Sequence, residues 1–191
     1  LDEIDKVGND QRGDPAAALL EVLDSEQNST FRDHYLEVPF DLSNVMFITT
    51  ANTTDTIPRP LLDRMEVIEL SSYTDKEKLQ IAKRHLLPRQ LKRHGLKRAQ
   101  LKINDRGLEA LITGYTKESG VRMLEQKLAA ICRKCAMQVV EKGIKQIHIT
   151  DSELQEFLGP RKYLDDSVDR DALVGVVNGL AWTSVGGEIL E

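Results

Sequence analysis

The spacing of the apolar residues changes part-way along this chain, and that change limits the folds it can adopt. In residues 1–72, short β-rich runs at 45–50 (VMFITT) and 67–70 alternate with helical patterns at 14–24 and in the string PLLDRM. Strands that alternate with helices predict a parallel sheet covered by helices. We therefore expect the first part of the chain to belong to an α/β domain, with 45–50 as a buried strand.

Residues 73–158 predict a small helical domain instead, because capping residues and glycines there bracket longer helical patterns. The expected helices run from Thr74 to about His94 with a disruption at Pro88, from Asn104 or Asp105 to near Gly114, and from near 118–120 to about Lys142. Gly95 and Gly143 supply stops. A short strand at 146–149 and a last helix at 151–158 complete the expected domain.

The end of the chain predicts a linker followed by a further domain. Residues 159–173 contain Pro160 and many charged residues, which is typical of a linker. Residues 174–191 alternate Gly, Val and small residues, which predicts β structure. The chain has no initiator Met and stops inside an expected strand, so we expect both ends to be cut from a longer protein.

The composition argues against several classes of protein. A net charge of −5 disfavours nucleic acid as an obligatory partner, since phosphate binding needs clustered cations. No apolar run approaches the ~20 residues that span a bilayer, and no secretory signal opens the chain, so we expect no membrane association. Cys132 and Cys135 are too few for a disulfide scaffold, and they predict core packing in a reducing cytosol.

Two adjacent carboxylates, Asp2 and Glu3, stand at the end of an expected strand. Such a pair suits nucleotide hydrolysis, because one carboxylate can hold Mg²⁺ through its water shell and the next can orient an attacking water. The alternative is an ordinary acidic surface pair. Asn52 follows the run at 45–50, where it either faces a ligand crevice and positions water near a γ-phosphate, or simply forms a turn.

Two arginines have a pair of interpretations each. Arg64, beside Asp63 near the end of a short helix, is either a surface ion-pair member or a finger that stabilises phosphate charge in a neighbouring subunit. Arg122, in the first turn of a helix, has the same two interpretations. The run from Lys83 to Arg98 holds seven Lys or Arg and no acid, which indicates a solvated helical face or a weak nucleic-acid contact.

One glycine pattern has the spacing of a phosphate loop, but the residues that follow it do not fit one. Gly8 and Gly13 have the spacing of a phosphate loop, but Asp14 and Pro15 follow where Lys and Ser or Thr are required. An Asp at that place would repel phosphate. Since no other such pattern occurs, we expect the main phosphate-binding loop to be missing from this chain.

The order of these elements resembles the AAA+ ATPases, and the wording of several strings resembles the bacterial Lon proteases. Those strings are LDEIDK, RGDPAAALLEVLD, FRDHYLEVPFDLS, IPRPLLDRMEVIEL, YTDKEKLQIAKRHLLP and SGVRMLEQKLAAICRK. The resemblance covers essentially the whole chain. It implies the C-terminal part of an AAA+ parallel-sheet subdomain at 1–72, a helical AAA+ lid subdomain at 73–158, and the first strands of a protease domain at 174–191.

By motif position, the resemblance also assigns roles. It implies that Asp2 and Glu3 are the Walker B pair, for Mg²⁺ and for water activation, and that Asn52 is sensor 1. Arg64 matches the arginine finger that acts in trans, and Arg122 matches sensor 2. ATP and Mg²⁺ are therefore the implied cofactors.

Two further assignments follow from the same resemblance. Tyr73 and Ile81 lie at the hinge and the first helix of the lid, where adenine packing is expected. The segment from Val7 to Asp14 falls where these ATPases place a second pore loop, which touches translocating polypeptide.

The Lon family joins its ATPase to a protease with a Ser–Lys dyad, in which a desolvated neutral Lys takes the proton of the Ser nucleophile. We expect the dyad beyond Glu191 and the phosphate loop before Leu1, so the chain alone is expected to be inactive. The implied partners are protein substrates and copies of the protein in a ring, expected to be a hexamer, in the cytoplasm. Two alternatives remain: an AAA+ remodelling ATPase without a protease, and a non-enzymatic helical binding module.

Overall fold

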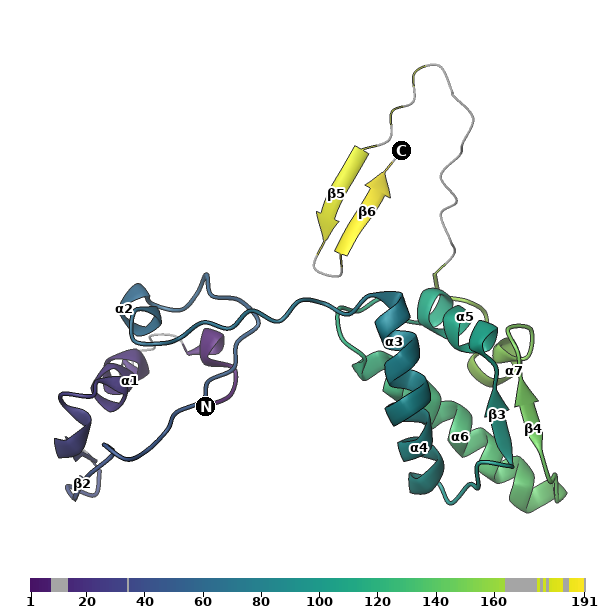
Figure 1. Ribbon diagram of the computed structural model, residues 1–191, viewed down its shortest axis with the longest axis horizontal. Coiled ribbons are helices and arrows are strands. Elements are labelled where there is room, and N and C mark those ends of the chain that lie inside the picture. Colours follow the sequence, from purple (N-terminus) through teal and green to yellow (C-terminus); the bar gives the residue numbers. More distant parts are fainter. Residues whose placement is uncertain are drawn as a thin grey trace. The chain divides into compact units, whose positions relative to one another are not determined.

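The structure is a computed structural model of the 191-residue chain, and it describes residues 1–7, 14–33, 35–163, 175, 177, 179–183 and 186–190. The chain divides into two compact units, Leu1–Leu70 and Ser71–Glu191 (Figure 1). Each unit has its own buried apolar cluster. Within the described residues, no helix is long and apolar enough to cross a membrane.

The first unit is built around helix α1 (Pro15–Leu23), which confirms the helix predicted at 14–24. The Oδ1 atom of Asp14 accepts hydrogen bonds from two backbone N–H groups of the first turn, at 3.0 and 3.3 Å. Pro15 fits the first helical position, because no N–H is needed there. The buried core of the unit comprises Ile4, Ala16, Ile57 and Leu61.

Short elements complete this unit. Helix α2 (Arg59–Leu62) is the short helix predicted in PLLDRM. Two 3-10 turns span Ile4–Lys6 and Asn28–Thr30, and strand β1 (Phe31–Arg32) pairs antiparallel with β2 (Pro39–Phe40). The β1–β2 pair was not predicted, because two-residue strands are too short to carry a periodic pattern.

The run at 45–50 differs from its prediction as a buried strand. It is extended and bonds to Leu1, but Met46 is 85% exposed and Ile48 is 69% exposed. Residues 67–70, also predicted as a strand, form none in the structure, and Leu70 is 90% exposed. A strand is buried by its neighbours, and among the described residues the sequence-distant backbone partners of this run are Leu1 and the residues just after Leu1. The predictions of strands at 45–50 and 67–70 are therefore wrong for this structure, because strand pairing and burial both depend on partners further away in the fold.

The second unit opens with a long helical run made of α3 (Asp75–Ile81), a π-helical turn (Ala82–Leu86) and α4 (Leu87–Arg93). Thr74 and Glu77 form a capping box at its start. The predicted disruption is present, one turn ahead of Pro88. Proline lacks the N–H that would bond the fourth carbonyl before it, and its ring crowds that carbonyl, so the preceding turn widens.

Three helices and two strands complete the helical unit. They are α5 (Asp105–Tyr115), α6 (Arg122–Lys142), α7 (Leu154–Leu158), β3 (Leu101–Ile103) and β4 (Ile147–Ile149). β3 and β4 are parallel and pair Leu101 with Ile147. The caps predicted for α5 and α6 are confirmed: Asn104 accepts from a first-turn N–H at 2.7 Å, and Gly143 has the left-handed φ of 64° that ends α6.

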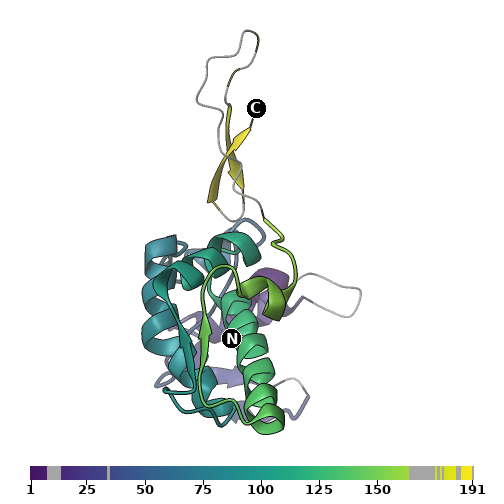
Figure 2. The same ribbon diagram turned by 90° about the vertical axis from the view of Figure 1, so that its right-hand side faces the viewer.

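Helix α6 is the centre of this unit's core. Figure 2 shows the long α6 beside the run formed by α3 and α4. Its buried face is Leu124, Leu128, Ile131, Cys132 and Cys135. This arrangement confirms the predicted core role of the two cysteines, which are free thiols.

The last described element is a hairpin of β5 (Gly179–Thr183) and β6 (Gly186–Leu190), paired antiparallel. It confirms the β structure predicted for 174–191. From residue 164 on, the linker predicted at 159–173 lies outside the described residues. Most of the predicted pore-loop segment, residues 8–13, lies outside them too.

Candidate functional site

Two backbone segments of the first unit run side by side in the same direction. The N-terminal amine of Leu1 donates to the Ile48 carbonyl at 2.8 Å, and the Thr50 N–H donates to the Leu1 carbonyl at 3.0 Å. In neighbouring parallel strands, a residue donates its N–H to one residue of the partner strand and accepts from the residue two positions further along it. Leu1 does this with Ile48 and Thr50. Asp2 and Glu3 therefore follow one segment at the same edge where Asn52 follows the other.

Thr50 joins the two segments through its side chain. Its hydroxyl donates to the Asp2 carboxylate and accepts from the Glu3 backbone N–H at 3.2 Å. One oxygen of Asp2 is held in this way, and its Oδ2 has no protein partner among the described residues. The arrangement orients an exposed carboxylate as a second-sphere hydrogen bond orients a metal ligand.

Glu3 lies where the chain turns sharply after Asp2. Its φ of 55° is left-handed, which costs about 1 kcal/mol for a residue with a side chain. The turn is held by buried Ile4, whose N–H donates to the Thr50 carbonyl at 2.9 Å. The Glu3 carboxylate accepts from Lys6 Nζ at 2.7 Å, and this hydrogen bond raises the pKa of Lys6. Both side chains are more than half exposed, so the pair is open to solvent.

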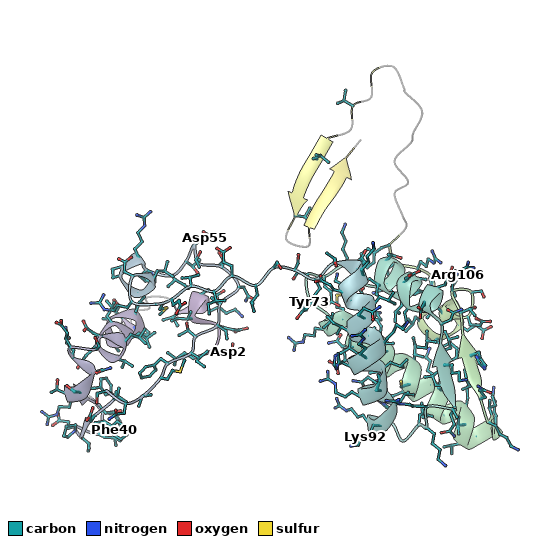
Figure 3. All side chains as sticks on the ribbon, viewed as in Figure 1. Asp2, Phe40, Asp55, Tyr73, Lys92 and Arg106 are labelled. Carbon is teal, nitrogen blue, oxygen red and sulfur yellow. The ribbon has the colours of Figure 1, made fainter. Side chains whose placement is uncertain are left out.

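Asn52 lies two residues after Thr50, exposed and with no side-chain partner within the described part of the unit. It lines an open groove of about 580 Å³ together with Ile4, Thr50, Asp55 and Ile57. Figure 3 labels Asp2 and Asp55 in this unit. The structure thus brings Asn52 to the edge that carries Asp2 and Glu3, while its backbone lies in an irregular segment as a turn residue would.

Arg64 forms an ion pair inside its own unit. Its Nη2 lies 3.1 Å from Asp24 Oδ2, and its Nη1 donates to the Pro60 carbonyl at 3.0 Å. The pKa of Asp24 is lowered, first by the hydrogen bond from the Glu26 backbone N–H and then by Arg64. The Arg64 side chain is still 37% exposed. The ion-pair interpretation therefore describes the isolated chain, and part of the guanidinium remains accessible.

The structure brings Tyr73 and Ile81 into one pocket of the second unit. Most of the surface that lines this pocket of about 480 Å³ consists of apolar atoms. The other residues that line it are Lys76, Glu77, Gln80, Arg84 and His85. Figure 3 shows Tyr73 at the start of the unit, next to α3. An aromatic ring and a branched aliphatic side chain facing one pocket can hold a flat heteroaromatic ring.

Arg122 is the first residue of α6 and lines a different, more polar groove of about 530 Å³. Its guanidinium is exposed and has no hydrogen-bond or ion-pair partner within residues 71–163. One turn on, Glu125 is already satisfied by Arg89 at 2.5 Å and by buried Gln90 at 2.6 Å. Arg122 is therefore a free cation at the start of a long helix.

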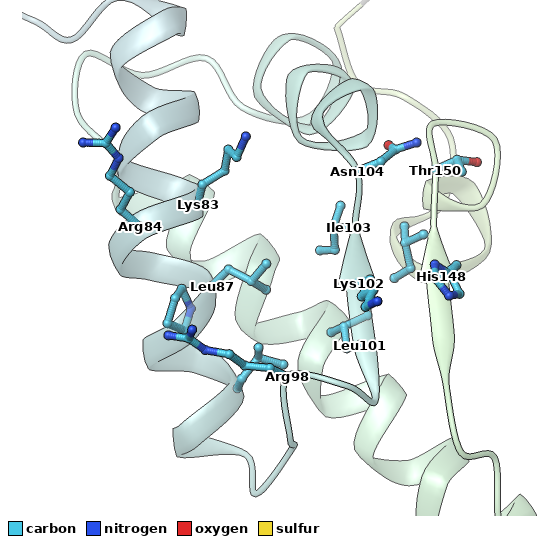
Figure 4. Close-up of a pocket in the computed structure, with 13 residues that line it drawn as sticks. Lys83, Arg84, Leu87, Arg98, Leu101, Lys102, Ile103, Asn104, His148 and Thr150 are labelled. Carbon is cyan, nitrogen blue, oxygen red and sulfur yellow. The ribbon is translucent and has the colours of Figure 1, made fainter.

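A further groove lies between α4 and β3 and has a volume of about 660 Å³. Figure 4 shows Lys83 and Arg84 on the helical side, Arg98 on the connecting loop, and Lys102 and His148 on the strands. The floor is apolar, with Leu87, Leu91 and Ile103 among its residues. Within the described residues, Lys83 pairs with Asp105 at 2.8 Å, and the groove itself is lined by no acid.

Among the described residues, no cluster of His, Cys, Asp or Glu has the three or more members that would hold a metal ion by itself. Burial raises the pKa of the Cys132 thiol to about 11 and that of the Cys135 thiol to about 12. Both thiols are thus protonated near neutral pH, whereas a metal or redox site needs thiolates. The structure agrees with the prediction that this pair packs in the core.

Sequence reasoning did not identify two side chains next to these residues. Thr50 contacts Asp2 across 48 positions of sequence, and no local pattern indicates such a contact. Glu118 caps α6 by accepting from the Met123 and Leu124 N–H groups at 2.8 Å each. An acid just ahead of a predicted helix start was the available signal for Glu118.

Comparison with known proteins gives matches to three family models, in the order of the chain. The model of the ATPase family associated with various cellular activities (AAA) matches residues 1–73. The Lon protease AAA+ ATPase lid domain matches residues 92–155, and the Lon protease (S16) C-terminal proteolytic domain matches residues 148–191. The chain is 57% identical over 190 residues to the Lon protease of Desulforamulus reducens and 54% identical over 191 residues to Lon protease 1 of Bacillus subtilis.

The chain belongs to the Lon protease family. All of the chain aligns with these two Lon relatives, and it spans 24% and 25% of their respective lengths. A solved structure of the Bacillus subtilis Lon protease SSD domain is 48% identical, covers 49% of the chain and has a TM-score of 0.41. The prediction of the Lon family, and with it of an α/β part, a lid and the start of a protease domain, is confirmed.

Proposed function

We propose that this Lon chain supplies the hydrolytic half of an ATP site in an ATP-dependent serine protease. The observation that carries the proposal is the parallel pairing of Leu1 with residues 48–50, because it brings Asp2, Glu3 and Asn52 to one edge. In open α/β sheets, ligands bind at the edge where the strands end. A surface acidic pair without function would not need a partner strand that ends in a polar amide.

The residues at this edge fit a magnesium nucleotide. Carboxylate and water oxygens are the ligands that Mg²⁺ takes, and Asp2 offers an exposed oxygen while Thr50 holds the other. We assign Asp2 to Mg²⁺ through water, Glu3 to orienting the attacking water, and Asn52 to positioning that water. When bound, Mg²⁺ neutralises charge on the phosphates.

The arginines and the lid pocket complete the proposed site. Arg64 is assigned to a phosphate in the neighbouring protomer, and Arg122 is assigned to the γ-phosphate of the nucleotide held by its own protomer. The Tyr73–Ile81 pocket is assigned to the adenine, since its lining is mainly apolar. We propose the boundaries 1–72, 73–158, 159–173 and 174–191 for the large subdomain, the lid, the linker and the start of the protease domain.

We further propose that the complete protein works as a ring, a hexamer, on unfolded protein substrates in the cytoplasm. An arginine that acts in trans requires a neighbouring copy, and this supports the ring. The free, buried thiols of Cys132 and Cys135 suit a reducing compartment. The proteolytic dyad is assigned to the protease domain beyond the residues of this chain.

The test is degradation of an unfolded casein substrate by the full-length protein that carries this chain, with ATP supplied. Glu3→Gln is expected to keep ATP binding and to lower ATP hydrolysis about 10²-fold or more. Degradation should fall with it. Glu109→Gln, an exposed carboxylate on α5, is the matched control and should leave both activities unchanged. Full ATP-dependent degradation by Glu3→Gln would overturn the assignment.

A second candidate function is a weak contact with nucleic acid through the basic groove between α4 and β3. All the charged side chains that line that groove are basic, in a chain of net charge −5, and this is the observation that favours it. Lys102→Glu combined with Arg98→Glu should weaken DNA binding and flatten its salt dependence. Arg89→Glu, outside the groove, is the comparison variant. Equal losses from both would assign the binding to general charge rather than to the groove.

A further inference from the structure

The loop at 116–121 joins α5 to α6, and hydrogen bonds tie it to α3, to Tyr73 and to the first turn of α6. Lys78 Nζ donates to the Glu118 carbonyl at 2.5 Å. The Tyr73 N–H donates to the Ser119 carbonyl at 3.0 Å. The Glu118 carboxylate accepts from the first turn of α6. Arg122 stands one residue beyond this loop.

Lys78 is an unusual partner for a loop carbonyl because it is buried. Only 7% of the residue is exposed, and its nearest acid is the exposed Asp75 at 3.9 Å. A buried ammonium is costly unless its donors are satisfied. Its short bond to the Glu118 carbonyl therefore fixes the loop to α3.

Glu118 performs the capping that the residue before α6 does not. Val121 stands at the N-cap position and has no side-chain oxygen. The two carboxylate oxygens of Glu118 accept one N–H each, from Met123 and Leu124, both at 2.8 Å. A carboxylate here also lies against the positive end of the 21-residue helix. The first turn of α6, which includes Arg122, is held by this contact.

The same loop is attached to the predicted adenine pocket. Tyr73 lines that pocket with its side chain and bonds to Ser119 through its backbone. Lys78 belongs to α3, whose capping box begins at the next residue after Tyr73. One network of hydrogen bonds thus reaches from Tyr73 to the start of α6.

We propose that Lys78 and Glu118 are positioning residues that hold Arg122 in fixed relation to the Tyr73–Ile81 pocket. One rigid part of the lid then contacts both the base of a nucleotide and its γ-phosphate. This inference rests on the proposed role of Arg122 and of the pocket. It predicts that loss of the network weakens recognition of the γ-phosphate and leaves recognition of the base intact.

The experiment measures the affinity of the full-length protein for fluorescent analogues of ATP and ADP. Glu118→Gln and Lys78→Met are expected to weaken ATP binding about tenfold, since one hydrogen bond to a charged group is lost. ADP binding should change by less than about twofold, because ADP lacks the phosphate that Arg122 contacts. Glu109→Gln and Lys142→Met, both exposed, are the matched controls and should leave both affinities unchanged.

The same variants are then made in an Arg122→Ala background. If Lys78 and Glu118 act through Arg122, their effect on ATP affinity disappears there, because the three residues are coupled. An equal tenfold loss with and without Arg122 overturns the inference and leaves a structural role alone. Equal weakening of ATP binding and ADP binding by these variants also overturns the inference. If Arg122→Ala itself leaves the ratio of ATP to ADP affinity unchanged, then the proposed function of Arg122 fails as well.

Discussion

The Thr50 hydroxyl donates to the carboxylate of Asp2, across two backbone segments that run parallel. Since the same hydroxyl accepts from the Glu3 N–H, one side chain sets the position of both acids. Removing it should therefore disturb hydrolysis more than binding.

Thr50→Val keeps the shape of the side chain and removes the hydroxyl. We expect kcat for ATP hydrolysis by the full-length protein to fall about tenfold, while KM changes by less than about threefold. Thr49→Val is the control, because among the described residues the Thr49 hydroxyl bonds to the Met65 sulfur, at 3.8 Å, and not to Asp2 or Glu3. Steady-state phosphate release measures both constants. Equal losses in the two variants would contradict the role given to Thr50.

The ion pair of Arg64 with Asp24 offers a way to separate its two interpretations. If the pair is only structural, Arg64→Ala and Asp24→Asn should both leave ATP hydrolysis nearly unchanged and should lower stability by similar small amounts, since the pair is partly exposed. If Arg64 acts on phosphate in a neighbouring protomer, Arg64→Ala should lower ATP hydrolysis about 10³-fold, and Asp24→Asn should not. We expect the second outcome. Mixing Arg64→Ala protomers with Glu3→Gln protomers should restore part of the activity. A site that takes Glu3 from an Arg64→Ala protomer and Arg64 from a Glu3→Gln neighbour has both residues.

A substitution in the lid pocket should lower the affinities for ATP and ADP equally, whereas loss of Lys78 or Glu118 should lower the affinity for ATP alone. Ile81→Asn places a polar group in the mainly apolar lining. We expect the affinity for both nucleotides to fall by a similar factor, about tenfold. Equilibrium titration of the full-length protein with the two fluorescent analogues measures it. A selective loss of ATP would contradict adenine packing at this position.

How far the sequence predicts the structure depends on the range of the interaction that decides each feature. The cap of α5, at Asn104 or Asp105, and the stop of α6 at Gly143 were predicted because capping and helix ends are settled within one turn, and the structure selects Asn104. The contact of Thr50 with Asp2 was not predicted, because it joins residues 48 positions apart. Lys78 looks like one more surface lysine in a charged helix, and only the fold shows that it is buried.

The run at 45–50 illustrates the same limit in the opposite direction. Its residues are those of a buried strand, and yet Met46 and Ile48 are exposed in this chain. The residue pattern predicts which structure a segment adopts when suitable partners lie beside it. It does not predict which segments lie nearby in the fold. The order of the motifs was more informative than any one of them, because Asp2 and Asn52 gain meaning only from their shared edge.

The cap of α5 gives a prediction about stability. Asn104 Oδ1 accepts from the Gly107 N–H at 2.7 Å, so Asn104→Ala should lower the free energy of unfolding by about 1 kcal/mol. Asn104→Asp should restore most of it, since Asp also caps and lies favourably at a helix start. Gly107→Ala should destabilise too, although Ala favours helices, because an added Cβ would lie 3.0 Å from Asn104 Oδ1 and 3.2 Å from the Ile149 carbonyl. Urea unfolding followed by the helical circular dichroism signal measures all three.

The buried thiols predict how stability changes at alkaline pH. Burial raises the pKa of Cys132 from 9.0 to about 11 and that of Cys135 from 9.0 to about 12. A group whose pKa is raised on folding contributes its stability below the unfolded value, so this contribution should be complete at pH 8. Above about pH 9 the unfolded thiols lose their protons first. Stability should then fall, by up to about 1.4 kcal/mol per pH unit for each thiol.

Urea unfolding of the chain between pH 7 and pH 10.5 measures this dependence. The double variant Cys132→Ala with Cys135→Ala should be less stable throughout, because it leaves cavities in the core. Its stability should nevertheless fall less steeply above pH 9 than that of the unaltered chain. An identical slope would show that other groups cause the alkaline loss. At pH 8 the native thiols should also react with iodoacetamide far more slowly than in urea, since only thiolate attacks the reagent.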